Sequence, residues 1–157
     1  MKFLIVVAST VIILSTAMPA QASYSDSKYR MQNQKVFVFY PRELRWVAYE
    51  NGRKIKSGVA NGGKPGYKTP SGVFYIYSKN GVNHVSSKYP LNSNGTRGGA
   101  KMPYAMHFTK AGHAIHGSPQ ISNQNSSHGC IRVKTKYAKW LNEEFMTRNT
   151  KVIVYPY

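Results

Sequence analysis

The sequence predicts a single, mainly β domain of the sandwich or open-barrel type, with one helix near its C-terminus. Three observations lead to this prediction. Short runs of β-branched and aromatic residues recur along the chain, turn signals separate them, and only one segment has the apolar spacing of a helix. Short strands with turns between them and a single helix are typical of a β-sandwich or an open barrel. A chain of 157 residues has the usual length of one domain.

The first 22 residues differ in composition from the rest of the chain. Lys2 precedes an apolar run over residues 3–17, and an Ala-x-Ala ending closes at Ala22. This pattern is typical of a secretory signal peptide. The run is short for a membrane span and contains hydroxyl residues, so we expect cleavage after Ala22 and no stable membrane span afterwards. Residues 23–33 are polar and are interpreted as a flexible tail, which leaves residues 34–157 as the folded domain.

The remaining elements follow in chain order. The strands expected from composition and alternation cover residues 36–40, 44–50, 53–60, 72–77, 102–108, 114–115 and 151–155. Asn51-Gly52 predicts a tight hairpin between the second and third of them. Tyr137, Leu141 and Phe145 recur every four residues and predict a helix over residues 135–146. The Gly- and Asn-rich residues 92–99 predict a mobile loop, either a plain connector or a lid.

The charge is strongly unbalanced. The formal net charge is +17, and it becomes +16 without Lys2, because all five acidic residues lie beyond position 22. A small domain this basic attracts polyanions. For an exported protein we expect anionic wall or surface polymers as partners and no nucleic acid, although the charge also serves solubility.

Cys130 is the single cysteine, so it cannot form a disulfide within the chain. Composition alone leaves three alternatives: an inert core thiol, an intermolecular link or a reactive group. Its surroundings favour the reactive group. His128 lies two residues before Cys130 and His116 fourteen before it, and a nucleophilic thiol needs a base or a positive neighbour. The backbone N–H groups of Gly129 and Cys130 are expected to face a developing oxyanion.

No acidic residue lies between positions 84 and 133. A nearby carboxylate therefore cannot orient His116, and a backbone carbonyl or the Ser118 hydroxyl is expected to do so. The other histidines, His84, His107 and His113, are interpreted as structural or surface groups.

Four stretches together resemble the signature of the YkuD-type L,D-transpeptidases, a family of cysteine enzymes that remodels bacterial peptidoglycan. They are His116-Gly117, Ser127-His128-Gly129-Cys130-Ile131-Arg132, the turn and strand at residues 68–74 and the segment at 102–108. The resemblance runs from about residue 36 to 155. It implies that residues 34–157 are an L,D-transpeptidase catalytic domain that acts on peptidoglycan stem peptides, without cofactor or metal, in the periplasm or at the cell wall.

The resemblance also implies roles for individual residues. Cys130 would be the nucleophile that forms a thioester, and His116 the general base. Supporting positions would be Ser127, His128, Gly129, Gly117 and Ser118, and the substrate would contact Arg132 and Tyr104.

Alternative functions stay open at this point. Water in place of an amine acceptor would make the chain an L,D-carboxypeptidase. His116, His128 and Cys130 are also three possible zinc ligands, which would suit a zinc-dependent cell-wall amidase. A basic surface-binding protein without turnover is the non-enzymatic alternative.

Overall fold

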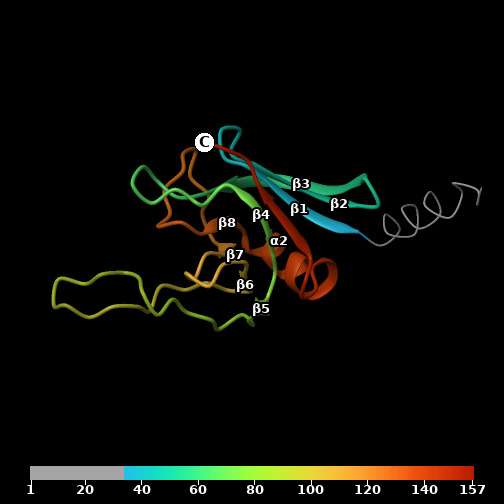
Figure 1. The fold of residues 1–157 in the computed structure, drawn as a ribbon. Helices are drawn as coiled ribbons and strands as arrows, with labels where there is room; N and C mark the ends of the chain where they lie inside the picture. Colours follow the sequence, from blue (N-terminus) through green and yellow to red (C-terminus); the bar gives the residue numbers. More distant parts are fainter. Residues whose placement is uncertain (1–33) are drawn as a thin grey trace, which may run out of the picture.

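The computed structural model describes residues 34–157, so the expected signal peptide and tail lie outside the described residues. Nine strands form one sheet in the order β4-β9-β1-β2-β3-β8-β7-β6-β5 (Figure 1). The strands are β1 (Lys35–Tyr40), β2 (Arg45–Glu50), β3 (Arg53–Asn61), β4 (Gly72–Tyr75), β5 (Ser78–Lys79), β6 (Met106–His107), β7 (Ala114–Ser118), β8 (Ile131–Lys134) and β9 (Lys151–Val154). The predicted mainly β class with a curled open sheet is confirmed.

The β2–β3 hairpin forms at the predicted turn. Asn51 and Gly52 have φ values of 53° and 76°, the left-handed conformation that a two-residue hairpin turn requires. β3 then continues past the hairpin, where Ala60 and Asn61 pair with β8. β3 therefore joins the half of the sheet that contains the hairpin to the half that contains β7 and β8.

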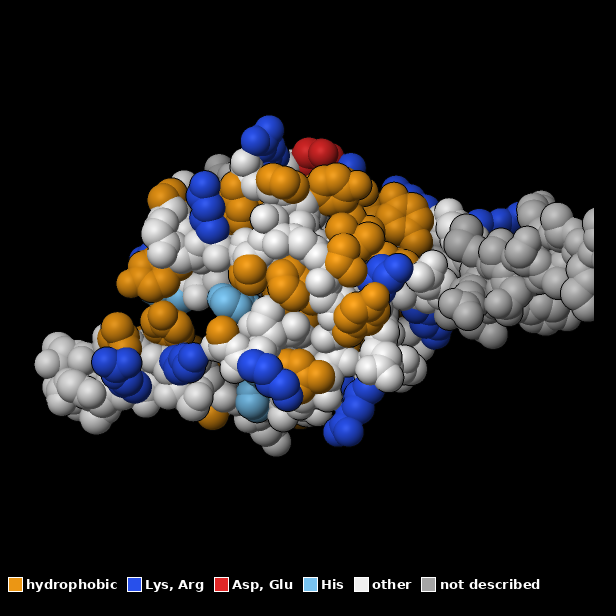
Figure 2. All heavy atoms as spheres, viewed as in Figure 1, with side chains coloured by type: hydrophobic (Ala, Val, Ile, Leu, Met, Phe, Trp, Pro, Cys, Tyr) orange, Lys and Arg blue, Asp and Glu red, His pale blue; other side chains and the backbone are white. Residues whose placement is uncertain are grey.

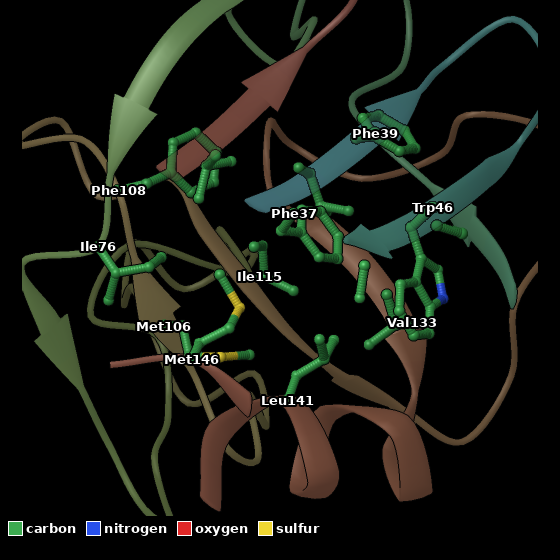
Figure 3. Close-up of a cluster of buried hydrophobic side chains, with 14 of the residues drawn as sticks. Phe37, Phe39, Trp46, Ile76, Met106, Phe108, Ile115, Val133, Leu141 and Met146 are labelled. Atoms are coloured by element: carbon green, nitrogen blue, oxygen red, sulfur yellow. The ribbon is translucent and has the colours of Figure 1, made fainter. Parts of the chain in front are cut away.

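The main core lies inside the curl of the sheet and is closed on one side by the helical segment (Figure 3). Phe37 and Trp46 are fully buried, and their rings stack with centroids 5.7 Å apart. Ile115 from β7 and Leu141 from the helical segment are also fully buried and point into the same cluster. Burying these side chains stabilises the fold by about 1.5–3 kcal/mol each, and it fixes β7 against the helix.

The predicted helix over residues 135–146 is present, but its second half has a different geometry. Residues Thr135–Trp140 form the α-helix α2, and Leu141–Phe145 form the π-helix η1. The N–H of Met146 donates to Leu141 O at 2.7 Å, five residues back, which is the π-type bond. The wide turn lets Leu141, Asn142 and Phe145 all face inward. Asn142 donates its amide to Asn80 O at 3.1 Å, which ties the turn to the chain beside β5.

Two expected strands are shorter than the sequence suggested. Residues 102–108 contribute only β6, because Tyr104 has a φ of 58° and interrupts the extended chain. The carbonyl of Pro103 instead accepts the N–H of Gly117 at 2.8 Å. Residues 72–77 form β4 only as far as Tyr75, and Ile76 then turns its side chain into the core.

Residues 84–101 form an extension that projects from the body of the domain (Figure 1). Isolated bridges at Val85–Lys101 and Leu91–Arg97 hold its two arms together, and a turn at Asn92–Thr96 closes it. The Gly- and Asn-rich segment 92–99 is its tip, and its mobility stays a prediction. Within residues 34–157, no helix is long and apolar enough to cross a membrane.

Candidate active site

A cavity of about 860 Å³ lies between the body of the domain and the base of the extension. Cys130 and His116 both line it, together with residues from the 66–68 turn, the extension and the end of β7. On the face shown in Figure 2, Lys, Arg and His side chains are spread among hydrophobic ones, and the visible carboxylates lie at its top edge. The sequence-predicted nucleophile and base are thus brought to one site.

The sheet explains why residues fourteen positions apart meet. β7 and β8 are adjacent and parallel, with Ile115 opposite Ile131 and His116 opposite Arg132. Cys130 comes directly before β8, so it lies beside Ala114 at the start of β7. His116 and Cys130 are therefore held by neighbouring strands with their backbones fixed by the sheet.

His116 is buried, with 6% of its surface exposed. Its Nδ1–H donates to Gly117 O at 2.9 Å, because a carbonyl oxygen can only accept. The other ring nitrogen, Nε2, then carries the lone pair. Burial lowers the pKa of His116 to about 4, and the positive charge of Arg132 adds to this effect. His116 is consequently neutral near pH 7 and able to take up a proton.

The Cys130 thiol is half-buried and packs against a small apolar cluster of Met102, Ala105 and Ala114. Burial raises its pKa above the ordinary thiol value, although the Ala114 amide and Arg132 act in the opposite direction. The thiol contact within hydrogen-bond range is with Gly112 O at 3.9 Å. At rest, the site therefore contains a neutral thiol and a neutral imidazole rather than an ion pair.

Ser127 shapes the turn that carries the thiol. Its buried hydroxyl donates to Cys130 O at 2.6 Å and accepts the Gly129 N–H at 3.0 Å. The expectation that the Gly129 N–H faces an oxyanion is wrong in this conformation, because that group is already bonded. Gly129 has a φ of 112°, and a Cβ there would lie 2.7 Å from His113 Cδ2. A residue with a side chain would disturb the turn.

His128 is exposed and takes part in an aromatic stack. Its ring lies on Tyr89 of the extension at a centroid distance of 4.3 Å, and Tyr67 meets its edge at 4.9 Å. All three side chains line the cavity. The two tyrosines were missed by sequence reasoning, since nothing in the local sequence brings residues 67, 89 and 128 together.

The other predicted site residues have different surroundings. Gly117 is buried, and a Cβ there would lie 3.1 Å from Pro103 Cγ and Thr135 Cα, so β7 packs closely at this point. The Ser118 hydroxyl donates to Gln120 O at 2.7 Å, which leaves the Gly117 carbonyl to orient His116.

Arg132 and Tyr104 were both predicted to bind substrate. Arg132 lines the cavity, and its Nη1 donates to Ser126 Oγ at 3.4 Å. Tyr104 packs against the main core and is not among the residues that line the cavity.

The electrostatics of the cavity are one-sided. All five histidines of the chain line the cavity. His84, His107 and His113 were expected to be structural or surface groups, and their place at the cavity was not predicted. Four permanently charged cations also line the cavity, namely Lys68, Lys88, Lys101 and Arg132. No carboxylate lines it. Such a site favours an anionic ligand. In the described part of the chain, no three His, Cys, Asp or Glu side chains are grouped to hold a metal ion.

Comparison with known proteins gave one family. The sequence matches the model of the L,D-transpeptidase catalytic domain over residues 33–154. No curated protein sequence matches the chain.

Several solved structures resemble this one. The LD transpeptidase LdtMt1, solved in complex with imipenem, has a TM-score of 0.69 and 27% identity, with 78% of this chain and 59% of that chain covered. An L,D-transpeptidase from Xylanimonas cellulosilytica has a TM-score of 0.66 and 25% identity, with 88% and 70% covered. An L,D-transpeptidase from Mycobacterium tuberculosis H37Rv has a TM-score of 0.64 and 25% identity, with 78% of this chain and 57% of that chain covered. The chain thus spans less than two thirds of the first of these proteins.

Proposed function

The chain belongs to the family of L,D-transpeptidase catalytic domains, and on this premise we propose that it transfers peptidoglycan stem peptides through a thioester on Cys130. One observation carries the proposal. Cys130 shares a cavity with His116, whose ring is buried, neutral and oriented by Gly117 O. A neutral imidazole with a free Nε2 is the form that a general base requires.

In the first half of the reaction, Sγ of Cys130 attacks the carbonyl carbon of the third stem residue while His116 Nε2 takes the thiol proton. The C–S bond forms, and the bond from that carbon to the nitrogen of the terminal D-alanine breaks. The protonated His116 gives its proton to the departing amine. The products are free D-alanine and a thioester on Cys130.

In the second half, an amine attacks the thioester and His116 accepts the amine proton. The C–N bond forms, the C–S bond breaks, and the thiolate regains its proton from His116. A neighbouring stem peptide, a protein lysine and a free D-amino acid all present such an amine. If water attacks instead, the same residues perform the L,D-carboxypeptidase reaction.

The positive cavity suits this donor because stem peptides carry several carboxylates. Arg132 and Lys68 both line the cavity without a carboxylate partner among the described residues. We propose that these cations hold the donor carboxylates near Cys130. The cationic surface would further hold the enzyme on anionic wall polymer after export with residues 1–22 as signal peptide.

The central experiment is intact-mass analysis of the protein after incubation with tetrapeptide-stem muropeptides. The wild type should gain one acyl group, and Cys130→Ala should gain none. An adduct on another residue, or unchanged wild-type mass together with no release of D-alanine, would refute the proposal. A carbapenem should also acylate Cys130 and no other residue.

Two controls separate this mechanism from the alternatives. Iodoacetamide should abolish turnover, whereas a chelator should not, and the opposite pattern would favour a zinc amidase. A protein that only binds wall material would bind sacculi and show no turnover, with Cys130→Ala indistinguishable from wild type in both measurements.

The role of His116 has its own test. His116→Ala should slow acylation by roughly 10²–10⁴-fold, the usual contribution of a positioned acid–base group. Because the pKa of Cys130 is raised by burial, rescue of this variant should need a pH above the ordinary thiol value of about 8.5. His128→Ala should slow acylation less than His116→Ala does, since the thiol keeps its proton acceptor. Equal activity of both variants and wild type would exclude the Cys–His mechanism.

A further inference from the structure

His113 lies against the turn that carries the nucleophile. β7 and β8 pair in parallel with Ile115 opposite Ile131, so His113 lies beside Gly129, one residue before the pair formed by Ala114 and Cys130. A Cβ built on Gly129 would lie 2.7 Å from His113 Cδ2 and 2.9 Å from its Nε2. The Nε2 edge of the imidazole therefore occupies the space that the glycine leaves open.

Thr109 holds the His113 ring and determines which nitrogen carries the proton. Thr109 Oγ1 accepts the backbone N–H of His113 at 3.2 Å and lies 2.7 Å from His113 Nδ1. In residues 34–157 this hydroxyl has no other hydrogen-bond acceptor, and we assign it as the donor to Nδ1 in this contact. The ring proton of neutral His113 is then on Nε2.

The Nε2–H of His113 has no acceptor among the described residues, and the ring lines the same cavity as Cys130. Burial lowers the pKa of His113, and the neighbouring charge of Lys88 lowers it further, so the ring is neutral near pH 7. A half-buried donor without a protein partner, next to a nucleophile, is suited to bind an oxygen of the ligand. Such a donor would take the place of the Gly129 N–H, which is already bonded to Ser127 Oγ.

We propose that His113 is a further catalytic residue, whose Nε2–H binds the carbonyl oxygen of the acyl donor as Cys130 attacks, and that Thr109 is its positioning residue. This inference rests on the proposed acyl transfer at Cys130. His113 moves no proton in the reaction. It stabilises the negative charge that develops on the oxygen when the C–S bond forms.

The test compares variants that remove the donor with variants that keep it. Thr109→Val removes the hydroxyl at nearly constant shape, and Thr109→Ser keeps it. His113→Phe keeps a ring without a donor, and His113→Gln keeps an N–H group. Each protein is acylated with two donors, the stem tetrapeptide and p-nitrophenyl acetate, and is alkylated separately with iodoacetamide, a reaction that develops no oxyanion.

Acylation should slow by roughly 10²-fold in Thr109→Val and His113→Phe, the usual effect of losing one oxyanion donor. Thr109→Ser and His113→Gln should recover most of the rate, and alkylation should be the same in all five proteins. Equal losses in acylation and alkylation would mean a structural role and would overturn the proposal, as would undiminished acylation in both donor-free variants. A wild type that reacts with the ester but not with the stem peptide would refute the proposed function and leave this comparison intact.

Nitrogen-15 NMR of the imidazoles provides a readout that needs no substrate. The wild type should show His113 as the Nε2–H tautomer, and Thr109→Val should shift the ring toward a mixture of tautomers. An Nδ1–H tautomer in the wild type would overturn the inference, whatever the rates.

Discussion

The buried, neutral His116 should make the fold sensitive to acid. The folded protein holds the pKa of His116 at about 4, mainly through burial, whereas an unfolded chain has the ordinary value of about 6.5. Between these two values the unfolded state binds the proton and the folded state does not. Stability is therefore fully present above pH 6.5 and is lost as the pH falls toward 4. The difference of 2.5 pKa units corresponds to about 3 kcal/mol at 1.36 kcal/mol per unit.

The assay is equilibrium urea unfolding, followed by the fluorescence of the buried Trp46, at pH 7 and at pH 4. His116→Asn removes the titrating group. Between pH 7 and pH 4, the free energy of unfolding of this variant should therefore fall by about 3 kcal/mol less than that of the wild type. Other groups titrate too, so the difference between the two proteins isolates His116. His128→Asn, at an exposed position, serves as the matched control and should retain nearly all of the wild-type loss.

The same pH dependence of unfolding in the wild type and His116→Asn would refute a buried, neutral His116. That result would mean that the His116 ring reaches water in the folded protein. The neutral base of the proposed mechanism would then lose its structural support as well.

Three further predictions concern activity and binding. The rate of Cys130 acylation should fall on the acid side with an apparent pKa near 4, because the pKa of His116 is lowered to about that value. An apparent pKa near 6.5 would contradict a buried base. Gly129→Ala should destabilise the fold by about 1–3 kcal/mol and slow acylation, because its φ is 112° and a Cβ would contact His113. Gly95→Ala is its control: it shares a positive φ but has open space around it, so acylation should be unchanged. Binding to isolated sacculi should weaken steeply above physiological salt, where charges are screened over about 8 Å, and salt-independent binding would exclude the charged surface as the anchor.

The sequence was informative wherever the signal was local. Asn51-Gly52 predicts its hairpin because both residues tolerate the left-handed backbone that the turn needs. The four-residue spacing of Tyr137, Leu141 and Phe145 predicts the helical segment, but apolar spacing does not distinguish an α-helix from the π-type turn at Leu141–Phe145. The break at Tyr104 was not predictable either, since a positive φ at a tyrosine depends on packing and on the hydrogen bonds of its neighbours.

Some of the residues that line the cavity were predictable for a related reason. Cys130 and His116 stand out by residue type and by the glycines beside them. The Thr109–His113 contact has no such signal, because a Thr four residues before a His is common and only the fold brings the Thr109 hydroxyl against a ring that lines the cavity. The stacking of Tyr67 and Tyr89 on His128 depends on three distant segments that meet in space.

The packing of Cys130 against Met102, Ala105 and Ala114 has a consequence for oxidative damage. Peroxide attacks the thiolate, and the first product is a sulfenic acid that further oxidant converts to irreversible forms. Burial raises the pKa of this thiol and so keeps the thiolate population low while no acyl donor is bound. Under the proposed mechanism, the burial that makes His116 necessary as a base would also protect the nucleophile between turnovers, since the chain has no second cysteine with which Cys130 could form a disulfide.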